Sequence, residues 1–489
     1  MKKITIDPVT RLEGHGRIDI FLNDEGEVLN AYMVIPELRG FEKFAQGRRV
    51  EELTDITPRI CGVCPEAHHM ASTKACDAVY RVEVPPTAKK LRELFYSAFY
   101  VADHTVHFYI LAAPDFVLGP DAPVAERNIL GLIRKVGVEM GTRVIQARGK
   151  AMDIIGLLGG RKIHPTFALP GGVTRGINEA ERAQIEATAR EEIEFALFSL
   201  QLFRDIVLKN PAYVDMIRSE AFTLPTYSMG MVDEKNRVNF YDGKVRVVDP
   251  EGKELLQYRP HEYLEVVAER VEPWTYLKFP YLKKIGWKGL VAGKESGVYQ
   301  ATPLSRLNAS EGMATPRAQE AYEEFYKTFG KKPVHHLLAT HWARLIELLY
   351  AAERLFELST DPQITDPKIR NLPTEKPTEG VGIVEAPRGT LTHHYITDER
   401  GIVQKANLIV GTTNNYAPIS IAVKKAAQAL IQKGQPIREG ILNRVEMAFR
   451  LFDPCFGCAT HALPGRMPLE IRIRDERGNL KDVVKQNLS

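Results

Sequence analysis

Apolar residues along this chain recur mostly at helical intervals. Spacings of three and four residues between apolar side chains are typical of helices that bury one face. This pattern predicts helices over 59–81, 86–111, 121–158, 179–208, 316–329, 334–358, 419–433 and 439–451. So many long helices predict a helical bundle that supplies most of the core.

Strict alternation of apolar and polar residues is confined to short segments. It predicts a hairpin over 16–35, short strands over 229–258 and a second hairpin over 389–410, joined by turns that contain Asp or Gly. The proline-rich stretch 366–378 is predicted to be a surface excursion. Together the patterns predict a mainly α fold with small β appendages, an α+β architecture.

Composition and charge argue against nucleic acid and membranes as binding partners. The 489 residues include 65 Lys and Arg against 62 Asp and Glu, so the chain has no strongly basic field for nucleic acid. The most apolar helical stretch, 91–118, is interrupted by charged residues and predicts no membrane span. Charged residues also appear too early in the chain for a secretory signal. We therefore expect a cytoplasmic protein.

Four of the five cysteines form two Cys-x-x-Cys pairs near opposite ends of the chain, Cys61/Cys64 and Cys455/Cys458. The simplest interpretation is one four-thiolate metal site closed across the whole fold. Structural zinc fits the same spacing, and an iron-sulfur cluster or two separate redox pairs are further alternatives. The fifth, Cys76, is expected in the core.

The residues around both pairs resemble the large subunit of nickel-iron hydrogenases. The matching segments are Arg59-Ile-Cys-Gly-Val-Cys64, Asp453-Pro-Cys-Phe-Gly-Cys-Ala-Thr-His461, Asp7-Pro-Val-Thr-Arg-Leu-Glu-Gly-His15, Glu37-Leu-Arg-Gly-Phe-Glu42 and Glu385-Ala-Pro-Arg-Gly389. They occur in the family's order and span the chain. The resemblance implies a long-helix bundle of that family's type in a single body.

Within that body the sequence predicts five successive segments. They are a β-rich segment 1–58, a helical bundle 59–228, a β-rich insertion 229–310, a helical part with the C-terminal metal motif 311–461, and a C-terminal extension 462–489. The resemblance implies that an endopeptidase removes the extension after His461 during maturation. The alternative is that residues 462–489 remain attached as a C-terminal strand and tail.

The resemblance implies a nickel-iron centre at the four cysteines. All four would bind nickel, and Cys64 and Cys458 would also bridge to an iron that carries cyanide and carbon monoxide. Cys61 and Cys455 would be terminal thiolates. Heterolytic cleavage of H2 needs an electrophile for the hydride and a nearby base for the proton, and soft thiolates suit such a metal.

Several other side chains acquire roles through the same resemblance. Glu13, otherwise a plausible surface carboxylate, would relay the proton from a terminal cysteine. Arg388 would lie over the open metal face, held by Asp103 and Asp453; an Asp103–His107 pair on one helix is the alternative for that aspartate.

The remaining assignments concern groups around the metals. His68 would donate to a bridging sulfur. Thr412 and the backbone near Pro387 would hydrogen-bond the cyanides. Glu42, the Leu408 carbonyl and His461 would form a magnesium site.

The implied activity is reversible H2 cleavage, with electrons leaving through a partner. No cysteines are left for iron-sulfur clusters, so these are expected only in further electron-transfer subunits and in an iron-sulfur small subunit. Some motifs resemble the cytoplasmic viologen-reducing, heterodisulfide-linked branch and others the flavin- and NAD-coupled branch. A non-catalytic scaffold of the respiratory complex I type and a zinc-organised structural protein are the alternatives.

Overall fold

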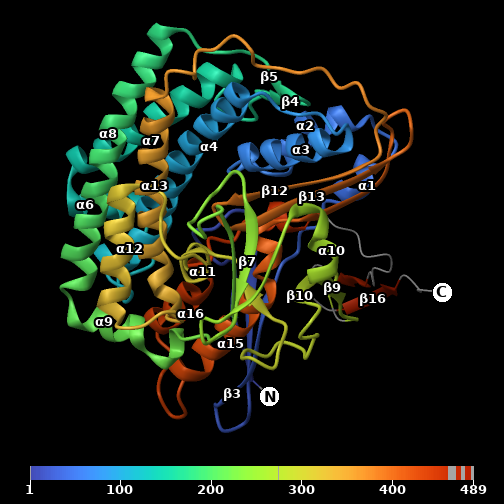
Figure 1. The fold of residues 1–489 in the computed structure, drawn as a ribbon. Helices are drawn as coiled ribbons and strands as arrows, with labels where there is room; N and C mark the ends of the chain where they lie inside the picture. Colours follow the sequence, from blue (N-terminus) through green and yellow to red (C-terminus); the bar gives the residue numbers. More distant parts are fainter. Residues whose placement is uncertain (1, 274, 461–469, 475–479, 486–489) are drawn as a thin grey trace.

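Long helices form one side of the molecule, and small sheets fill the other (Figure 1). A computed structural model describes all residues except 1, 274, 461–469, 475–479 and 486–489. The longer helices are α3 (Pro65–Val79), α4 (Pro86–Val106), α7 (Val138–Gly159), α8 (Glu179–Phe203), α12 (Pro316–Phe329), α13 (Thr340–Thr360), α15 (Tyr416–Leu430) and α16 (Glu439–Arg450). The prediction of a mainly α fold with small β parts is confirmed.

Shorter helical pieces connect and extend these helices. They are α1 (Phe41–Ala45), α2 (Leu53–Ile56), η2 (Thr57–Ile60), η3 (His107–Ala112), α5 (Ala113–Val117), α6 (Ile129–Val136), η4 (Arg204–Leu208), α9 (Pro211–Arg218), η6 (Pro260–Glu262), α10 (Tyr263–Val266), α11 (Pro303–Ala309), α14 (Gly411–Asn414) and α17 (Phe456–Ala459). Both η3 and η4 are π-helical turns that continue a long helix. Such turns are rare in proteins, and those that occur often lie near functional sites.

The bundle is built around α13. This helix packs against α8, α4 and α12, and α4 packs in turn against α7. Trp342 on α13 is 1% exposed and lies in the main core. The long α8 starts with a capping box, in which Asn178 and Glu181 each accept a hydrogen bond from the other's backbone N–H.

Three predicted helices differ from the structure. The helix expected over 334–358 begins only at Thr340, after a 3-10 turn over Leu337–Ala339. The helix expected over 59–81 begins only at Pro65, because proline favours the first helical position, and the preceding cysteine motif stays in a loop. The helix expected over 121–158 is two helices, α6 and α7, which break at Gly137 with φ of 91°. That left-handed conformation favours glycine and ends the first helix.

The sheets are small. One contains β1 (Lys2–Ile6), β2 (Arg17–Leu22) and β3 (Val28–Val34); another contains β12 (Glu379–Ala386), β13 (Gly389–Thr397) and β14 (Val403–Ile409); a third contains β11 (Tyr299–Gln300), β6 (Tyr227–Val232), β7 (Lys244–Val248) and β8 (Glu254–Tyr258). The remaining described pairs are β9 (Val267–Val271) with β10 (Lys278–Leu282), β4 (Ala168–Leu169) with β5 (Gly172–Val173), and β15 (Glu470–Arg474) with β16 (Leu480–Lys485).

The predicted hairpins over 16–35 and 389–410 and the strands within 229–258 are confirmed. The sequence pattern predicted neither β12 nor the short β4 and β5, and it placed β1, β9, β10 and β11 only as parts of segments expected to be β-rich. Segment 366–378 contains only an isolated bridge and runs over the surface, as predicted. The five-segment division of the chain stays a prediction.

None of the helices in the described part of the chain is long and apolar enough to cross a membrane.

Helix α3 and strand β12 approach each other closely. A Cβ atom at Gly382 would lie 2.2 Å from the Ala71 carbonyl oxygen, and one at Gly380 would lie 2.3 Å from the Val79 nitrogen. Only glycine at these two positions lets strand and helix pack this closely. The helix that starts at the first cysteine pair is thereby fixed to the strand that leads to Arg388.

Candidate metal centre

The four paired cysteines meet in one buried cluster. Cys61 and Cys64 lie in the loop between η2 and α3, whereas Cys455 precedes α17 and Cys458 lies within it. Their sulfurs form a ring with Sγ–Sγ distances of 3.1 Å (61–64), 3.4 Å (64–458), 3.0 Å (458–455) and 3.3 Å (455–61). Each cysteine is at most 4% exposed.

This donor set fits one thiolate-bound metal. Sulfurs that share an ion at ~2.3 Å can lie at most ~4.6 Å apart, and the ligand atoms here all lie within 4.8 Å of one another. In the described part of the chain no other group of three or more Cys, His, Asp or Glu converges in this way. Thiolates select soft metals such as nickel, zinc and iron.

The thiols differ in acidity. Burial raises the pKa of Cys458 well above its usual range. Burial also acts on Cys61, but hydrogen bonds from the other thiols and the charge of Arg388 outweigh it and lower the pKa of Cys61. A bound metal deprotonates a coordinating thiol outright, so all four can serve as thiolates.

Glu13 contacts the second cysteine pair directly. Its Oε2 accepts hydrogen bonds from the Cys455 thiol and from the Gly457 backbone N–H, both at 2.9 Å. Its backbone carbonyl accepts the Phe456 N–H at 3.1 Å. Burial and the negative charge of Cys61 raise the pKa of Glu13. A half-buried carboxyl with a raised pKa is suited to proton transfer.

Arg388 lies between two buried carboxylates in the turn from β12 to β13. Its Nη1 donates to Asp103 Oδ2 at 2.9 Å, and its Nη2 forms an ion pair with Asp453 Oδ2 at 3.0 Å. Asp103 therefore pairs with Arg388; His107, the alternative partner, lies near the Arg450 carbonyl instead. The guanidinium is charged and held rigidly at a 3% exposed position.

A second layer of buried charges supports this turn, and sequence reasoning missed it. Arg344 Nη1 and Arg306 Nη2 donate to the Pro387 carbonyl at 3.1 and 3.3 Å. Arg306 also pairs with Glu347 at 2.6 Å and Glu385 at 3.0 Å. Loss of one partner from such a buried pair costs about 3–5 kcal/mol. The turn that presents Arg388 is therefore held from beneath.

Two further predicted residues also lie in this region. The Thr412 hydroxyl oxygen accepts the Cys455 backbone N–H at 3.0 Å, which leaves the hydroxyl proton available for a ligand. His68 is fully buried on α3, and its Nδ1 lies 3.1 Å from Nε2 of His393 on β13.

The proposed magnesium ligands are only partly described. Glu42 Oε1 accepts the Leu408 N–H at 2.8 Å, so these two residues are adjacent. Lys278 Nζ lies 3.3 Å from Glu42 Oε2 and was not anticipated from the sequence. His461 lies outside the described residues. A carboxylate and a carbonyl are suitable magnesium ligands, whereas the neighbouring ammonium competes for the same carboxylate.

A buried ion-pair cluster fixes the segment that carries Glu13. Arg11 and Arg450 both pair with Asp115, at 2.6 and 2.7 Å, and Arg11 Nη1 also donates to the Leu111 carbonyl at 2.9 Å. Arg11 has φ of 59°, an uncommon conformation outside glycine. The role of Arg11 could have been suspected from the sequence, because Arg11 lies in the N-terminal motif two residues before Glu13.

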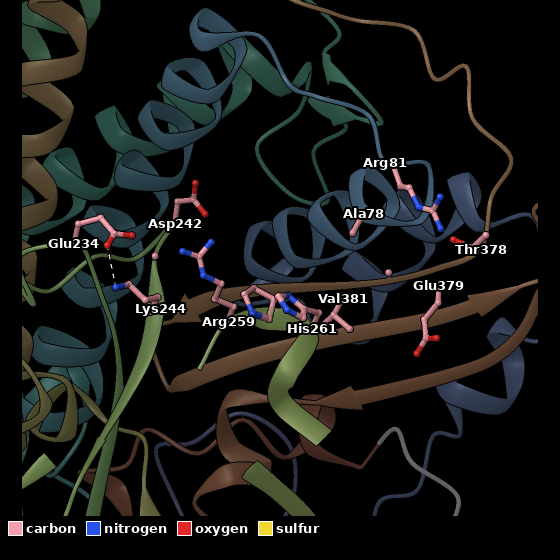
Figure 2. Close-up of a pocket in the computed structure, with 13 residues that line it drawn as sticks. Ala78, Arg81, Glu234, Asp242, Lys244, Arg259, His261, Thr378, Glu379 and Val381 are labelled. Carbon is pink, nitrogen blue, oxygen red and sulfur yellow. Dashed lines mark ion pairs between the residues drawn. The ribbon is translucent and has the colours of Figure 1, made fainter. Parts of the chain in front are cut away.

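One open pocket of the described structure lies away from the cysteines. Figure 2 shows this pocket of about 1000 Å³ between the end of α3, the β6–β7 connection, η6 and the start of β12. Its labelled cations Arg81, Lys244 and Arg259 are matched by acidic side chains in the same lining. No cysteine lines it. The thiolate site is thus a buried centre, which suits a very small substrate.

Comparison with known proteins identifies the family. A profile described as nickel-dependent hydrogenase matches residues 39–127 and 142–461. The chain belongs to the nickel-dependent hydrogenase family. A second profile, HoxL-like, matches residues 3–38. Together the matches contain every cysteine of the metal centre and both Glu13 and Arg388.

Individual relatives match along almost their whole length. The chain is 49% identical to a subunit of the F420-non-reducing hydrogenase of Archaeoglobus profundus, covering 99% of this chain and 100% of the relative. It is 38% identical to NAD-reducing hydrogenase HoxS subunit beta of Cupriavidus necator, with 98% and 99% coverage. A crystal structure of NAD+-reducing [NiFe]-hydrogenase in the H2-reduced state matches with a TM-score of 0.88 and 36% identity, over 94% of this chain and 100% of that one.

These matches confirm the resemblance and the fold inferred from the sequence. The chain is the large, catalytic type of subunit of a nickel-iron hydrogenase, an oxidoreductase. The complex I-type scaffold and the structural zinc protein are therefore excluded as its class.

Proposed function

We propose that this chain cleaves H2 heterolytically and reversibly at a nickel-iron centre held by its four paired cysteines. The observation that supports this most is the arrangement around the buried sulfurs. A carboxyl group touches one thiol, and a charged guanidinium fixed by two aspartates lies beside the cluster. A structural metal site needs neither group.

The residues divide into ligands and ligand partners. Cys61 and Cys455 would bind nickel alone, and Cys64 and Cys458 would bridge to an iron that carries two cyanides and one carbon monoxide. When bound, this centre supplies the electrophile that polarises H2 and accepts its electron pair. The Thr412 hydroxyl would donate a hydrogen bond to one cyanide. The backbone around Pro387 would hydrogen-bond the other cyanide.

Proton movement would follow the contact between Cys455 and Glu13. The thiol already donates to Glu13 Oε2 at 2.9 Å, so the proton needs no rearrangement to cross between sulfur and oxygen. The raised pKa of Glu13 lets the carboxyl hold the proton and release it again. Glu13 is the relay between the sulfurs and the exterior.

Arg388 would act on H2 from the open side of the sulfur ring. Its positive charge faces the thiolates of Cys64 and Cys455, and both raise its pKa further, as do Asp103 and Asp453. A fixed cation in a dry site stabilises developing negative charge without reorganisation. His68 would orient a bridging sulfur through its ring N–H.

A magnesium ion held by Glu42, the Leu408 carbonyl and His461 would stabilise the C-terminal end of the chain. Lys278 beside Glu42 would then form part of the surrounding shell. Removal of magnesium by a chelator should lower thermal stability and leave the nickel content unchanged; unaltered stability would contradict this assignment.

Electrons would leave through an iron-sulfur small subunit. Four cysteines are committed to the centre, and Cys76 is fully buried and donates to the Val50 carbonyl. Val63, between Cys61 and Cys64, is 38% exposed, so a partner that docks there comes close to the sulfurs. The free cysteines agree with the reducing cytoplasm.

The names of the relatives suggest the acceptor class. Identity is higher to the F420-non-reducing hydrogenase subunit than to the NAD-reducing one, at 49% against 38%, which disfavours NAD+ as the acceptor. Together with the sequence motifs that resemble the viologen-reducing, heterodisulfide-linked branch, this leads us to favour that type of complex over the flavin- and NAD-coupled type. Hydrogen-dependent reduction of viologen and no reduction of NAD+ by the purified complex is the expected outcome.

Residues 462–489 would be removed by a maturation endopeptidase. The nickel-dependent hydrogenase profile stops matching at residue 461, the position of the expected cleavage. Intact-mass measurement of active protein should give a chain that ends at His461. An active chain with residues 462–489 still attached would contradict this.

The activity itself is best tested by isotope exchange between D2 and solvent protons, because this reaction needs only the metal centre and its base. We expect HD and H2 from the mature complex without any electron acceptor. Nickel-loaded protein that produces neither would overturn the proposed function.

A further inference from the structure

The helical hairpin formed by α6 and the start of α7 carries an unusual concentration of exposed apolar side chains. Five of the fifteen large hydrophobic residues that are exposed in the described part of the chain lie within 124–145. They are Val124 (53% exposed), Ile129 (38%), Leu130 (62%), Val138 (72%) and Ile145 (69%). We refer to these five residues as the α6–α7 surface. Contiguous apolar patches of this kind mark interaction sites.

The family profile does not match most of this hairpin. Residues 128–141 fall between the two stretches that the nickel-dependent hydrogenase profile matches. Figure 1 shows α6 at the outer edge of the bundle and α3, which starts directly after Cys64, on the other side of α4. The surface therefore lies apart from the place where electrons would leave the sulfurs.

An apolar cavity opens within the same surface. It has a volume of about 140 Å³, and its lining includes Ile129, Ile133, Val136, Met140 and Ile145. An engineered apolar cavity of ~150 Å³ holds a benzene ring. The α6–α7 cavity can thus accept one aromatic or branched aliphatic side chain. A buried apolar anchor in such a pocket is the typical energetic centre of a protein interface.

The charge of α6 itself is positive. Arg134 and Lys135 are exposed in its last turn, and α6 has no acidic residue. Neither of the two has an ion-pair partner among the described residues. The whole chain is almost neutral, with a formal charge of +3, so these two unpaired cations are a local feature. They favour a partner whose contact residues are acidic.

The segment just before the surface is attached to the rest of the molecule. Asn443 Nδ2 donates to the Pro120 carbonyl at 2.9 Å, and Arg444 pairs with Asp121. The segment that leads into α6 is therefore fixed to α16. A preorganised surface binds without the cost of ordering a mobile segment.

We propose that the α6–α7 surface binds another protein subunit, which inserts one aromatic or aliphatic side chain into the cavity and surrounds it with carboxylates. The fit of the cavity to a single side chain favours a polypeptide over a lipid surface. The relatives are named as subunits of hydrogenases, which agrees with such a partner. This interface goes beyond the proposed H2 chemistry and does not depend on it.

Carbodiimide crosslinking of the intact, co-produced complex tests the partner directly. This reagent joins amines to carboxylates in contact, so Lys135 should become linked to an Asp or Glu of another subunit. Links from Lys135 only within its own chain, or to a second copy of it, would overturn the proposal, as would no link at all.

A pair of matched variants tests the apolar anchor. The double variant Leu130→Glu/Val138→Glu should lose one of the other subunits from the complex in native mass spectrometry, with at least a hundredfold weaker association. Leu372→Glu is the control, because Leu372 is 71% exposed in the surface segment 366–378. Both variants should keep their nickel and D2 exchange, which shows that the chain remains folded.

The outcomes separate the possible occupants. Unchanged subunit composition in the double variant would overturn the proposal. So would wild-type binding to phosphatidylglycerol vesicles that the double variant loses, because that result would assign the surface to a membrane.

Discussion

The two cysteine pairs have the same spacing but are held in different ways. The first pair precedes the fifteen-residue helix α3, which the contacts of Gly380 and Gly382 fix to β12. The second pair surrounds a four-residue helix, α17, and depends on distant segments, since Glu13 and Thr412 bind its backbone and thiol. Two pairs of the same spacing thus meet in one cluster, while the structures that hold them differ.

The glycine inside each pair shows the difference most clearly. A Cβ atom at Gly62 would meet nothing within 4 Å. A Cβ atom at Gly457 would lie 2.6 Å from Glu13 Oε1. The second pair is therefore in direct contact with Glu13, the proposed proton relay, whereas the first is followed by a long helix.

The largest effect is expected for loss of a ligand from the second pair. Cys455→Ser replaces a soft thiolate with a weakly binding hydroxyl and removes the donor to Glu13. D2 exchange should fall at least ~1000-fold, together with metal content. Cys76→Ser is the matched control, because Cys76 is equally buried but lies outside the sulfur ring. Equal losses in both variants would contradict the assignment of the fifth cysteine.

Glu13→Gln separates metal binding from proton transfer. The amide keeps the size and the hydrogen bond from Gly457 but cannot carry a proton. Positioned acids and bases typically contribute 10²–10⁴-fold, so we expect about a hundredfold slower D2 exchange. Nickel content should stay unchanged. A parallel loss of nickel would show instead that Glu13 mainly holds the second pair in place.

The two internal glycines offer a direct comparison of the pairs. Gly457→Ala should displace the Glu13 carboxyl and slow D2 exchange by about tenfold, since ~1 Å misplacements of reacting groups have effects of this order or larger. Gly62→Ala should leave the rate within about twofold, because its surroundings are open and its backbone is unstrained. A reversed order would refute the difference in support.

The dependence of H2 oxidation on pH should come from Asp453, which lies next to the second cysteine pair. Burial raises the pKa of Asp453 to about 6, although Arg388 and Arg344 oppose it. Below that pH the neutral carboxyl no longer pairs with Arg388, so H2 oxidation should fall about three- to tenfold. The folded-state pKa lies above the usual 3.8, so stability falls as pH rises through this window.

Asp453→Asn provides the test of this pH response. The variant should be slower but should lack the acid limb of the pH–rate profile. Beside the first pair, burial raises the pKa of Glu66 well above its usual range. An acid limb that persists in Asp453→Asn would show that another group is responsible.

Much of the fold, and the convergence of the four cysteines, could be predicted from the sequence. Helical periodicity located α8, α12 and α16 closely, because their apolar faces pack against one core. The strand β12 was missed, because Gly380 and Gly382 weaken the strand pattern, and they do so for a tertiary reason, the contact with α3.

At the site, short motifs predicted the side chains that touch the sulfurs but not those that support them. Arg306 and Arg344 lie at ordinary helical positions in the sequence and acquire their role only where the fold brings them under the Pro387 carbonyl. Asp115 likewise gains meaning only through Arg11 and Arg450. Long-range ion pairs leave no local pattern in a single sequence.

Infrared spectroscopy combined with metal analysis of the mature complex tests the central claim most directly. Protein is nearly transparent where bound cyanide and carbon monoxide absorb, so the proposed centre predicts two cyanide bands and one carbon monoxide band with one nickel per chain. These bands should shift when H2 is added. A complex with zinc in the four-cysteine site and no such bands would contradict the account.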